Sequence, residues 1–188
     1  MRKILAQIPN ILTVIRILLI PVIIYLLQMD RHQLGLIIFV IAAVTDALDG
    51  FIAKSFKITS KFGTYLDPIA DKLLLNSTYA ILAIMGWLPI WLAALVWLRD
   101  LVIFVGAAAL KFRGYRLNIK PALVGKATTL SQIITVCLFF DVGVSKSLIT
   151  WQPVFVAATA ILTLWSGGYY VMVGIKMDEK EKINPVKA

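Results

Sequence analysis

Six long apolar segments, separated by short polar stretches, dominate the sequence. They cover approximately residues 10–28, 34–53, 62–85, 90–110, 122–141 and 150–174. Each approaches the length of roughly 20 residues that an α-helix needs to cross the hydrocarbon core of a bilayer. The pattern predicts an all-α protein, a polytopic membrane bundle of six transmembrane helices formed by a single domain, 1–188. Residues 1–9 are short, basic and mildly amphipathic, and we expect them to form an interfacial helix on the membrane surface.

Composition supports this fold class. Of the 188 residues, 60% are hydrophobic and only 15% are charged, and the mean hydropathy is +0.88. A soluble domain would be nearer half apolar and would carry more charge. The net charge of +9 indicates cytoplasmic loops and anionic lipid headgroups. It does not indicate nucleic acid, because no basic face is free of membrane-length apolar sequence.

Lysine and arginine are distributed unevenly over the connections. They are concentrated in the N-terminal residues, the 54–61 link, the 111–120 loop and the C-terminal tail, whereas the other connections hold only Arg31 and Lys146. Because cytoplasmic loops carry the excess of positive residues, both termini and the 54–61 link are predicted to be cytoplasmic.

Four aspartates gather in one stretch of this apolar chain, residues 46–71. Asp46 and Asp49 are spaced i, i+3, and Asp67 and Asp71 are spaced i, i+4. On helices, either spacing places both carboxylates on one face. Small and basic residues lie between the two pairs: Gly50, Ala53, Gly63, Lys54, Lys57 and Lys61. The stretch therefore predicts a divalent-metal site next to a phosphate site.

Charges within spans are costly, since one at the centre of a transmembrane helix costs roughly 2.5–3.5 kcal/mol. Four carboxylates with few cations nearby repel one another unless metal ions or protons neutralise them. Oxygen ligands favour Mg²⁺, Mn²⁺ or Ca²⁺ over zinc, and the single histidine, His32, falls on the outer side. Lys72 fits either the polar pocket or a structural role, in an ion pair or as a snorkelling residue near a helix end. A metal among basic residues suits phosphoryl chemistry.

This stretch resembles the signature of the CDP-alcohol phosphatidyltransferases. Its spacing is Asp46-x-x-Asp49-Gly50-x-x-Ala53-Lys54, then eight residues, then Gly63-x-x-x-Asp67-x-x-x-Asp71. The family pattern is D-x-x-D-G-x-x-A-R-x8-G-x-x-x-D-x-x-x-D, and Lys54 stands where the family usually has arginine. The positive charge is kept at this position, but a planar two-pronged donor is replaced by a point charge.

The resemblance implies the roles of these residues in a phosphatidyl transfer. Two divalent cations, Mg²⁺ or Mn²⁺, would be held by Asp46, Asp49, Asp67 and Asp71. The CDP-linked donor would be bound by Asp49, Gly50, Ala53, Lys54 and Gly63. Asp71 would also be the catalytic base that takes the proton of the acceptor hydroxyl. The attack displaces CMP from CDP-diacylglycerol and leaves a phosphodiester, a reaction of phospholipid biosynthesis.

The flanks at 8–21 and 62–74 resemble two bacterial branches of the family. Phosphatidylglycerophosphate synthase uses glycerol 3-phosphate as acceptor, and cardiolipin synthase uses phosphatidylglycerol. Asp100 and Thr128 fall where the first branch usually has glutamate and a second lysine. Fewer cations favour a diester, which carries one negative charge, over a monoester, which carries up to two. We therefore expect phosphatidylglycerol as acceptor and cardiolipin as product, with glycerol 3-phosphate as the alternative.

Three further cations are predicted to bind the acceptor: Arg99, Lys126 and Arg16. Arg99 has a simpler alternative, a structural ion pair with Asp100. The resemblance also implies a homodimer in the bacterial inner membrane, with its active site on the cytoplasmic side.

Two other classes of protein are less consistent with the sequence. A cation transporter also uses intramembrane carboxylates, but it would need a polar path to the outer side, where these spans carry almost no charge. It would also leave the spacing around 54–61 unexplained. A purely structural membrane adaptor gives no reason for a cluster of charges that is so costly to insert.

Overall fold

The structure is a computed structural model that describes residues 8–56, 61–113, 123–140 and 146–183, with side chains described within 13–45, 72–110, 112–113, 123–140 and 150–176. Throughout these ranges the chain is helical or forms short turns, with no strand. The helices are α2 (Ile8–Gln28), α3 (His32–Phe56), α4 (Lys61–Ile84), α5 (Ile90–Phe112), α6 (Leu123–Phe139) and α7 (Lys146–Ile183). The all-α prediction is confirmed.

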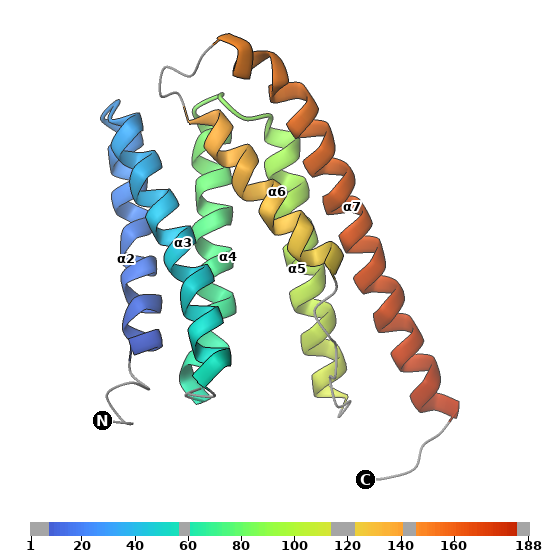
Figure 1. Ribbon diagram of the computed structural model, residues 1–188. Helices are drawn as coiled ribbons and strands as arrows, with labels where there is room; N and C mark the ends of the chain where they lie inside the picture. The colour runs from blue at the N-terminus through green and yellow to red at the C-terminus, as the bar shows by residue number, and fades with distance from the viewer. Residues whose placement is uncertain (1–7, 57–60, 114–122, 141–145, 184–188) are drawn as a thin grey trace.

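The helices run alternately up and down in one elongated bundle (Figure 1). The first residues of α2, α4 and α6 and the last residues of α3, α5 and α7 lie at one end of the bundle. Residues 46–56 and 61–71 therefore lie at the same end, although they belong to different helices. We refer to it as the signature end.

Each of the six apolar segments corresponds to one helix, but the last helix is longer than predicted. The sequence suggested an end near residue 174, ahead of a charged tail, whereas α7 continues to Ile183. The added residues, KMDEKEKI, alternate in charge sign over helical spacings, which supports a helix in water. The predicted interfacial helix falls largely on residues 1–7, outside the described part of the chain.

Two helices are long and apolar enough to cross a membrane by length and composition, at Ile90–Leu110 and Thr150–Lys176. The other apolar helices are shorter over the described residues: Thr13–Gln28, His32–Thr45, Lys72–Ile84 and Leu123–Phe139. The side chains of 46–71, where α3 and α4 carry the aspartates, lie outside the described part of the structure. The six-span topology therefore stays a prediction.

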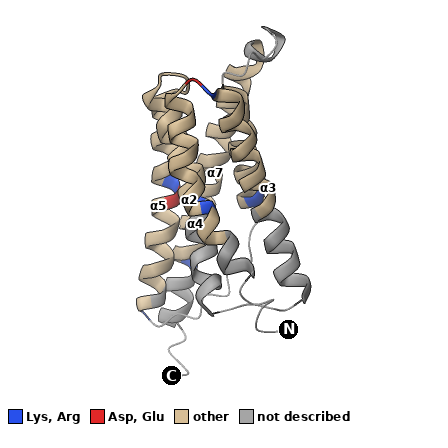
Figure 2. Ribbon diagram, turned by 90° about the vertical axis from the view of Figure 1, so that its left-hand side faces the viewer, with Lys and Arg blue, Asp and Glu red and all other residues tan. Residues whose placement is uncertain are grey.

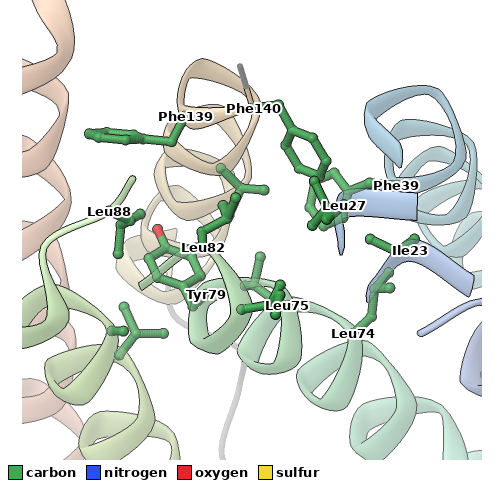
Figure 3. Packing of buried hydrophobic residues seen from close by; sticks show 14 of the residues in the cluster. Ile23, Leu27, Phe39, Leu74, Leu75, Tyr79, Leu82, Leu88, Phe139 and Phe140 are labelled. Carbon is green, nitrogen blue, oxygen red and sulfur yellow. The ribbon is translucent and has the colours of Figure 1, made fainter. Parts of the chain in front are cut away.

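Helix packing divides the bundle into two groups that α4 connects. α2 packs on α3 and α4, α7 packs on α5 and α6, and α4 also contacts α5 and α6. Figure 3 shows buried side chains of α2, α3, α4 and the end of α6 converging in one core. They include Ile23, Leu27, Phe39, Leu74, Leu75, Tyr79, Leu82 and Phe139. Most of this core lies away from the signature end.

The bundle has an apolar exterior and a partly polar interior, the reverse of a soluble protein. Large exposed hydrophobic side chains occur on all six helices, as at Leu18, Val40, Leu73, Phe104, Leu130 and Trp165. Buried polar side chains include those of Arg16, Asn76, Arg99, Gln132 and Ser166. Figure 2 shows the described charged residues as a few isolated segments on otherwise tan ribbons. Such an exterior is suited to lipid.

Two turns at the end opposite the signature close helices in the same way. After α2, the amide of Asp30 donates to Leu27 and the amide of Arg31 donates to Leu26. After α4, the amides of Gly86 and Trp87 make the equivalent bonds to Ala83 and Leu82. This is the Schellman arrangement, in which one residue adopts the left-handed conformation. Asp30 has φ 57° and Gly86 has φ 76°.

Gly86→Ala should lower the free energy of unfolding by about 1 kcal/mol, because alanine pays a steric cost in the left-handed region. A Cβ atom at Gly86 would meet no atom within 4 Å, so the loss would be purely conformational. The measurement is unfolding by SDS in mixed micelles. Gly106→Ala, inside α5 and equally open, is the matched control and should cause no loss. Equal destabilisation by both substitutions would contradict this reading of the turn.

Candidate active site

The four signature aspartates lie on two helices that meet the same end of the bundle. Asp46 and Asp49 belong to α3, and Asp67 and Asp71 belong to α4. The helical backbone thus agrees with the expected i, i+3 and i, i+4 spacings. The predicted donor residues Gly50, Ala53 and Lys54 are also on α3, and Gly63 is on α4. The side chains of all these residues are outside the described part of the structure.

The chemistry of the four carboxylates fits hard divalent cations such as Mg²⁺ or Mn²⁺. Among the residues whose side chains are described, no group of three or more His, Cys, Asp or Glu gathers. The side chains of the signature aspartates lie outside those residues, and their geometry as metal ligands stays a prediction.

A polar cluster lies directly next to the second aspartate pair, centred on Asp100 of α5. Lys72, the residue after Asp71, places its Nζ 3.1 Å from Asp100 Oδ1. Arg99 Nη1 lies 2.6 Å from the same oxygen. Asn76, one turn after Lys72, donates from Nδ2 to Asp100 Oδ2 at 3.2 Å. These contacts join α4 to α5 through one carboxylate.

Lys72 therefore does not simply snorkel towards the membrane surface. Its side chain is 31% exposed and its ammonium group pairs with a carboxylate that is only 8% exposed. This contact is the structural ion pair that was one alternative for Lys72, and a role of Lys72 in a polar substrate pocket stays a prediction. The neighbouring indole of Trp97 adds a further link between α4 and α5, because its Nε1 donates to the backbone oxygen of Asn76 at 3.0 Å.

Arg99 connects this cluster to α7. Its Nη2 donates to Ser166 Oγ at 2.5 Å, and its guanidinium carbon lies 5.9 Å from the centroid of the Tyr170 ring, within the range of a cation–π contact. The stem of Arg99 also lies close to the α7 backbone, since a Cβ at Gly167 would make an ordinary van der Waals contact with Arg99 Cγ at 3.6 Å. Arg99 is thus held from both sides in a polar part of the bundle.

The three predicted acceptor cations occupy different surroundings. Arg99 is 8% exposed and its structural pair with Asp100 is present. Arg16 is 3% exposed on α2. Lys126 is exposed in the first turns of α6. Only Arg99 joins the Asp100 cluster in the part of the chain that is described. Acceptor binding by any of the three stays a prediction.

Sequence reasoning did not identify Asn76, Ser166 and Tyr170 as members of this cluster. The only local signal was Asn76, an amide one turn after Lys72 inside an apolar helix. Ser166 and Tyr170 are 67 and 71 positions from Arg99 along the chain, and isolated polar residues in a long apolar helix do not reveal their partners.

A second polar seam joins α6 to α7. Thr159 Oγ1 lies 2.6 Å from Ser131 Oγ and 2.8 Å from Thr135 Oγ1. One turn further along, Gln132 Nε2 donates to Thr163 Oγ1 at 3.3 Å. Hydroxyl and amide contacts of this kind hold helices together where the surroundings are apolar. The seam fixes α6 against the helix that carries Ser166.

Thr128 belongs to this seam. It is fully buried, and its hydroxyl contacts Leu162 O of α7 at 3.1 Å and Val124 O of its own helix at 2.8 Å. A lysine at this position would have to push α6 and α7 apart. In this chain Thr128 is a helix-packing residue. Its bearing on the acceptor is therefore only that no lysine occupies this position.

Gly125 of α6 lies directly beside Tyr170 of α7. A Cβ at Gly125 would lie 2.8 Å from the hydroxyl oxygen of Tyr170, closer than real Cβ contacts. The ring of Tyr170 is the one that faces Arg99, and its edge also contacts Tyr169. The absence of a side chain at Gly125 therefore helps to keep Tyr170 beside Arg99.

Comparisons with known proteins give consistent findings. The family model described as CDP-alcohol phosphatidyltransferase matches residues 6–165. A probable phosphatidylglycerophosphate synthase of Mycobacterium tuberculosis is 33% identical over 89% of this chain and 81% of its own length. A CDP-diacylglycerol–glycerol-3-phosphate 3-phosphatidyltransferase of Bacillus subtilis is 30% identical over 89% and 90%. A probable CMP-forming cardiolipin synthase of Drosophila melanogaster is 42% identical over 56% and 33%.

Gly125→Ala should be about 1 kcal/mol less favourable for stability in the wild type than in a Tyr170→Phe background. In the wild type the added methyl group displaces the Tyr170 hydroxyl, whereas the gain in helix propensity from alanine is the same in both backgrounds. Tyr170→Phe removes the hydroxyl, and the nearest ring atom is then 3.5 Å from the new Cβ. Unfolding in SDS mixed micelles of the wild type, both single variants and the double variant measures the difference. An equal effect of Gly125→Ala in both backgrounds would contradict the assigned contact.

Proposed function

Because the chain belongs to the CDP-alcohol phosphatidyltransferase family, we propose that it transfers the phosphatidyl group of CDP-diacylglycerol to phosphatidylglycerol, forming cardiolipin and releasing CMP. The observation that carries the proposal is the signature at 46–71 inside the region that matches the family. The family consists of membrane enzymes of phospholipid synthesis that generally depend on divalent cations. The acceptor, the site residues and the assembly are the parts that are proposed here.

The donor half of the site is assigned to the ends of α3 and α4 that meet at the signature end. Asp46, Asp49, Asp67 and Asp71 would hold two divalent cations, Mg²⁺ or Mn²⁺. Such cations, when bound, offset the charge of the pyrophosphate and stabilise the charge that develops on the leaving group. Gly50, Ala53 and Gly63 would give the cytidine nucleotide close access to the helix backbones, and Lys54 would contact a phosphate as a point charge.

In the proposed chemical step, Asp71 accepts one proton. A hydroxyl oxygen of the acceptor forms a bond to the phosphorus of the phosphatidyl group. The bond from that phosphorus to the bridging oxygen breaks, and CMP leaves with the electron pair. Asp71 takes the proton of the attacking hydroxyl, which is the role of a general base. The product is a phosphodiester, so one phosphoric ester bond replaces one phosphoanhydride bond.

We place the protein in the bacterial inner membrane as a six-span homodimer, with the signature end on the cytoplasmic side. The apolar exterior supports membrane embedding, because lipid tails can cover exposed Leu98, Phe104 or Leu164 whereas water would not. The lysines and arginines near the signature end support the orientation. A site between helices also lets a diacylglycerol-bearing donor enter from the bilayer.

Two acceptors are supported by different observations. The lack of a second cation at Thr128 favours an acceptor phosphate with a single negative charge. Glycerol 3-phosphate remains the second candidate. The relatives from M. tuberculosis and B. subtilis are similar over most of the chain, and they are named as a phosphatidylglycerophosphate synthase and a glycerol-3-phosphate 3-phosphatidyltransferase.

Purified protein in liposomes should release CMP from CDP-diacylglycerol when Mg²⁺ or Mn²⁺ and phosphatidylglycerol are supplied. Liposomes that contain no phosphatidylglycerol but receive glycerol 3-phosphate should give much slower release. Faster release with glycerol 3-phosphate would assign the alternative acceptor. No release with either acceptor would contradict the proposed function itself.

Asp71→Asn should reduce kcat by about 100-fold or more, because an amide can neither take the proton nor hold a cation as a carboxylate does. The measurement is CMP release at saturating donor and acceptor. Asp30→Asn makes the same chemical change at an exposed turn and should leave the rate unchanged. Full turnover by Asp71→Asn would refute its assignment as the base.

A further inference from the structure

Two residues of α7, Ser166 and Tyr170, contact the guanidinium of Arg99 on α5. We propose that both are positioning residues, which hold Arg99 in the orientation in which it binds the phosphate group of the acceptor. This inference rests on the proposed function and deepens it, because acceptor binding by Arg99 is part of that proposal. Both residues lie beyond the region 6–165 that matches the family, so the match itself gives neither of them a role.

The hydroxyl of Ser166 is the partner of one guanidinium nitrogen. Arg99 Nη2 donates to Ser166 Oγ at 2.5 Å, and Ser166 is fully buried. Because bulk water does not reach this position, removal of the oxygen would leave Nη2 without a replacement partner. Hydrogen bonds that involve a charged group are also stronger than those between neutral groups. Ser166 therefore fixes the position of Nη2.

The ring of Tyr170 faces the same guanidinium from the next turn of α7. Its centroid lies 5.9 Å from Arg99 Cζ, within the range of a cation–π contact. Ser166 and Tyr170 are spaced i, i+4, which places them on one face of the helix. Between them, the backbone at Gly167 lies close to the stem of Arg99. One face of α7 thus contacts both the stem and the charged head of Arg99.

The third nitrogen of the guanidinium is available for a ligand. Nη1 pairs with Asp100 Oδ1 at 2.6 Å and Nη2 donates to Ser166, whereas the buried Nε has no hydrogen-bond partner among the described residues. Buried polar atoms usually have a partner, so the open Nε is consistent with a donor that the substrate uses. Because the guanidinium is planar and rigid, fixing its two outer nitrogens also fixes the direction of the Nε–H bond.

Loss of either α7 contact should affect the acceptor and not the donor. The CDP-linked donor is assigned to α3 and α4, whereas Arg99 is on α5 and its two partners are on α7. A guanidinium that can turn keeps its charge but spends less time in the productive orientation, which weakens acceptor binding. A purely structural role would instead lower the amount of active enzyme, which reduces kcat and leaves KM for both substrates unchanged.

The test is Ser166→Ala, compared with the wild type by CMP release in liposomes. Phosphatidylglycerol is the acceptor in one series and glycerol 3-phosphate in another, since each supplies a phosphate group. KM for the acceptor that the wild type uses should rise on the order of tenfold, because a buried hydrogen bond to a charged group is lost. KM for CDP-diacylglycerol should stay the same. Thr163→Val is the matched control, because it removes a buried hydroxyl of α7 that bonds Gln132 and not Arg99. It should leave both KM values unchanged.

Tyr170→Leu tests the second contact and remains informative if Ser166→Ala does not fold. Removal of the ring should raise KM for the acceptor about threefold, because the cation–π contact is lost. Tyr170→Phe keeps the ring and should cause the smaller increase of the two. A larger increase with Tyr170→Phe than with Tyr170→Leu would contradict a role for the ring.

A double variant tests whether Ser166 acts through Arg99. Arg99→Gln should itself raise KM for the acceptor, and Ser166→Ala in that background should cause no further rise, because the hydroxyl has lost its partner. Independent effects that multiply would overturn the inference, as would a lower kcat in Ser166→Ala with both KM values unchanged. An unchanged acceptor KM in Arg99→Gln would remove its premise and leave the transfer reaction in place. Absence of CMP release by the wild type would instead refute the proposed function.

Discussion

One buried carboxylate, Asp100, connects the helices on which the site depends. Charged groups in an apolar bundle are stable only when they are paired or hydrogen-bonded. Asp100 pairs with Lys72 and Arg99 and accepts a hydrogen bond from the amide of Asn76. Through Arg99 the connection reaches Ser166 on α7. The helix that carries Asp67 and Asp71 is thereby fixed relative to α5 and α7, which is the kind of support that a reaction requiring defined geometry needs.

The large apolar core residues and the buried arginines occupy different levels along the bundle. Apolar residues such as Leu27, Phe39 and Leu82 are packed away from the signature end, and the hydroxyl of Tyr79 ties α4 to α6 there by donating to Gln132 O at 3.1 Å. The two buried arginines, Arg16 and Arg99, lie nearer the signature end than the core residues of the same helices, α2 and α5. A well-packed half can hold the helices firmly while the other half retains the polar groups that a charged lipid substrate requires.

Much of the fold could be predicted because it depends on local sequence. Apolar runs of membrane length specify helices, and the aspartate spacing specifies which helix faces carry the signature. The length of α7 was underestimated because a charged tail was read as the end of a helix. The contacts of Arg99 with Ser166 and Tyr170 could not be predicted, since they depend on how α5 and α7 pack and not on local pattern. The packing role of Thr128 could not be predicted either. The sequence showed only that a lysine is absent at this position, and its contacts with α7 depend on how the two helices pack.

The central claim is that a phosphatidyl group moves from a CDP-linked donor to a lipid hydroxyl at this site. In the most direct measurement, liposomes contain phosphatidylglycerol whose glycerol headgroup is deuterated. The amounts of CMP and of each lipid product are then measured in the same sample by mass spectrometry. The account predicts one cardiolipin bearing the deuterated glycerol for each CMP released, with formation dependent on Mg²⁺ or Mn²⁺. Release of CMP without a deuterated product, or cardiolipin formed without CMP, would contradict it.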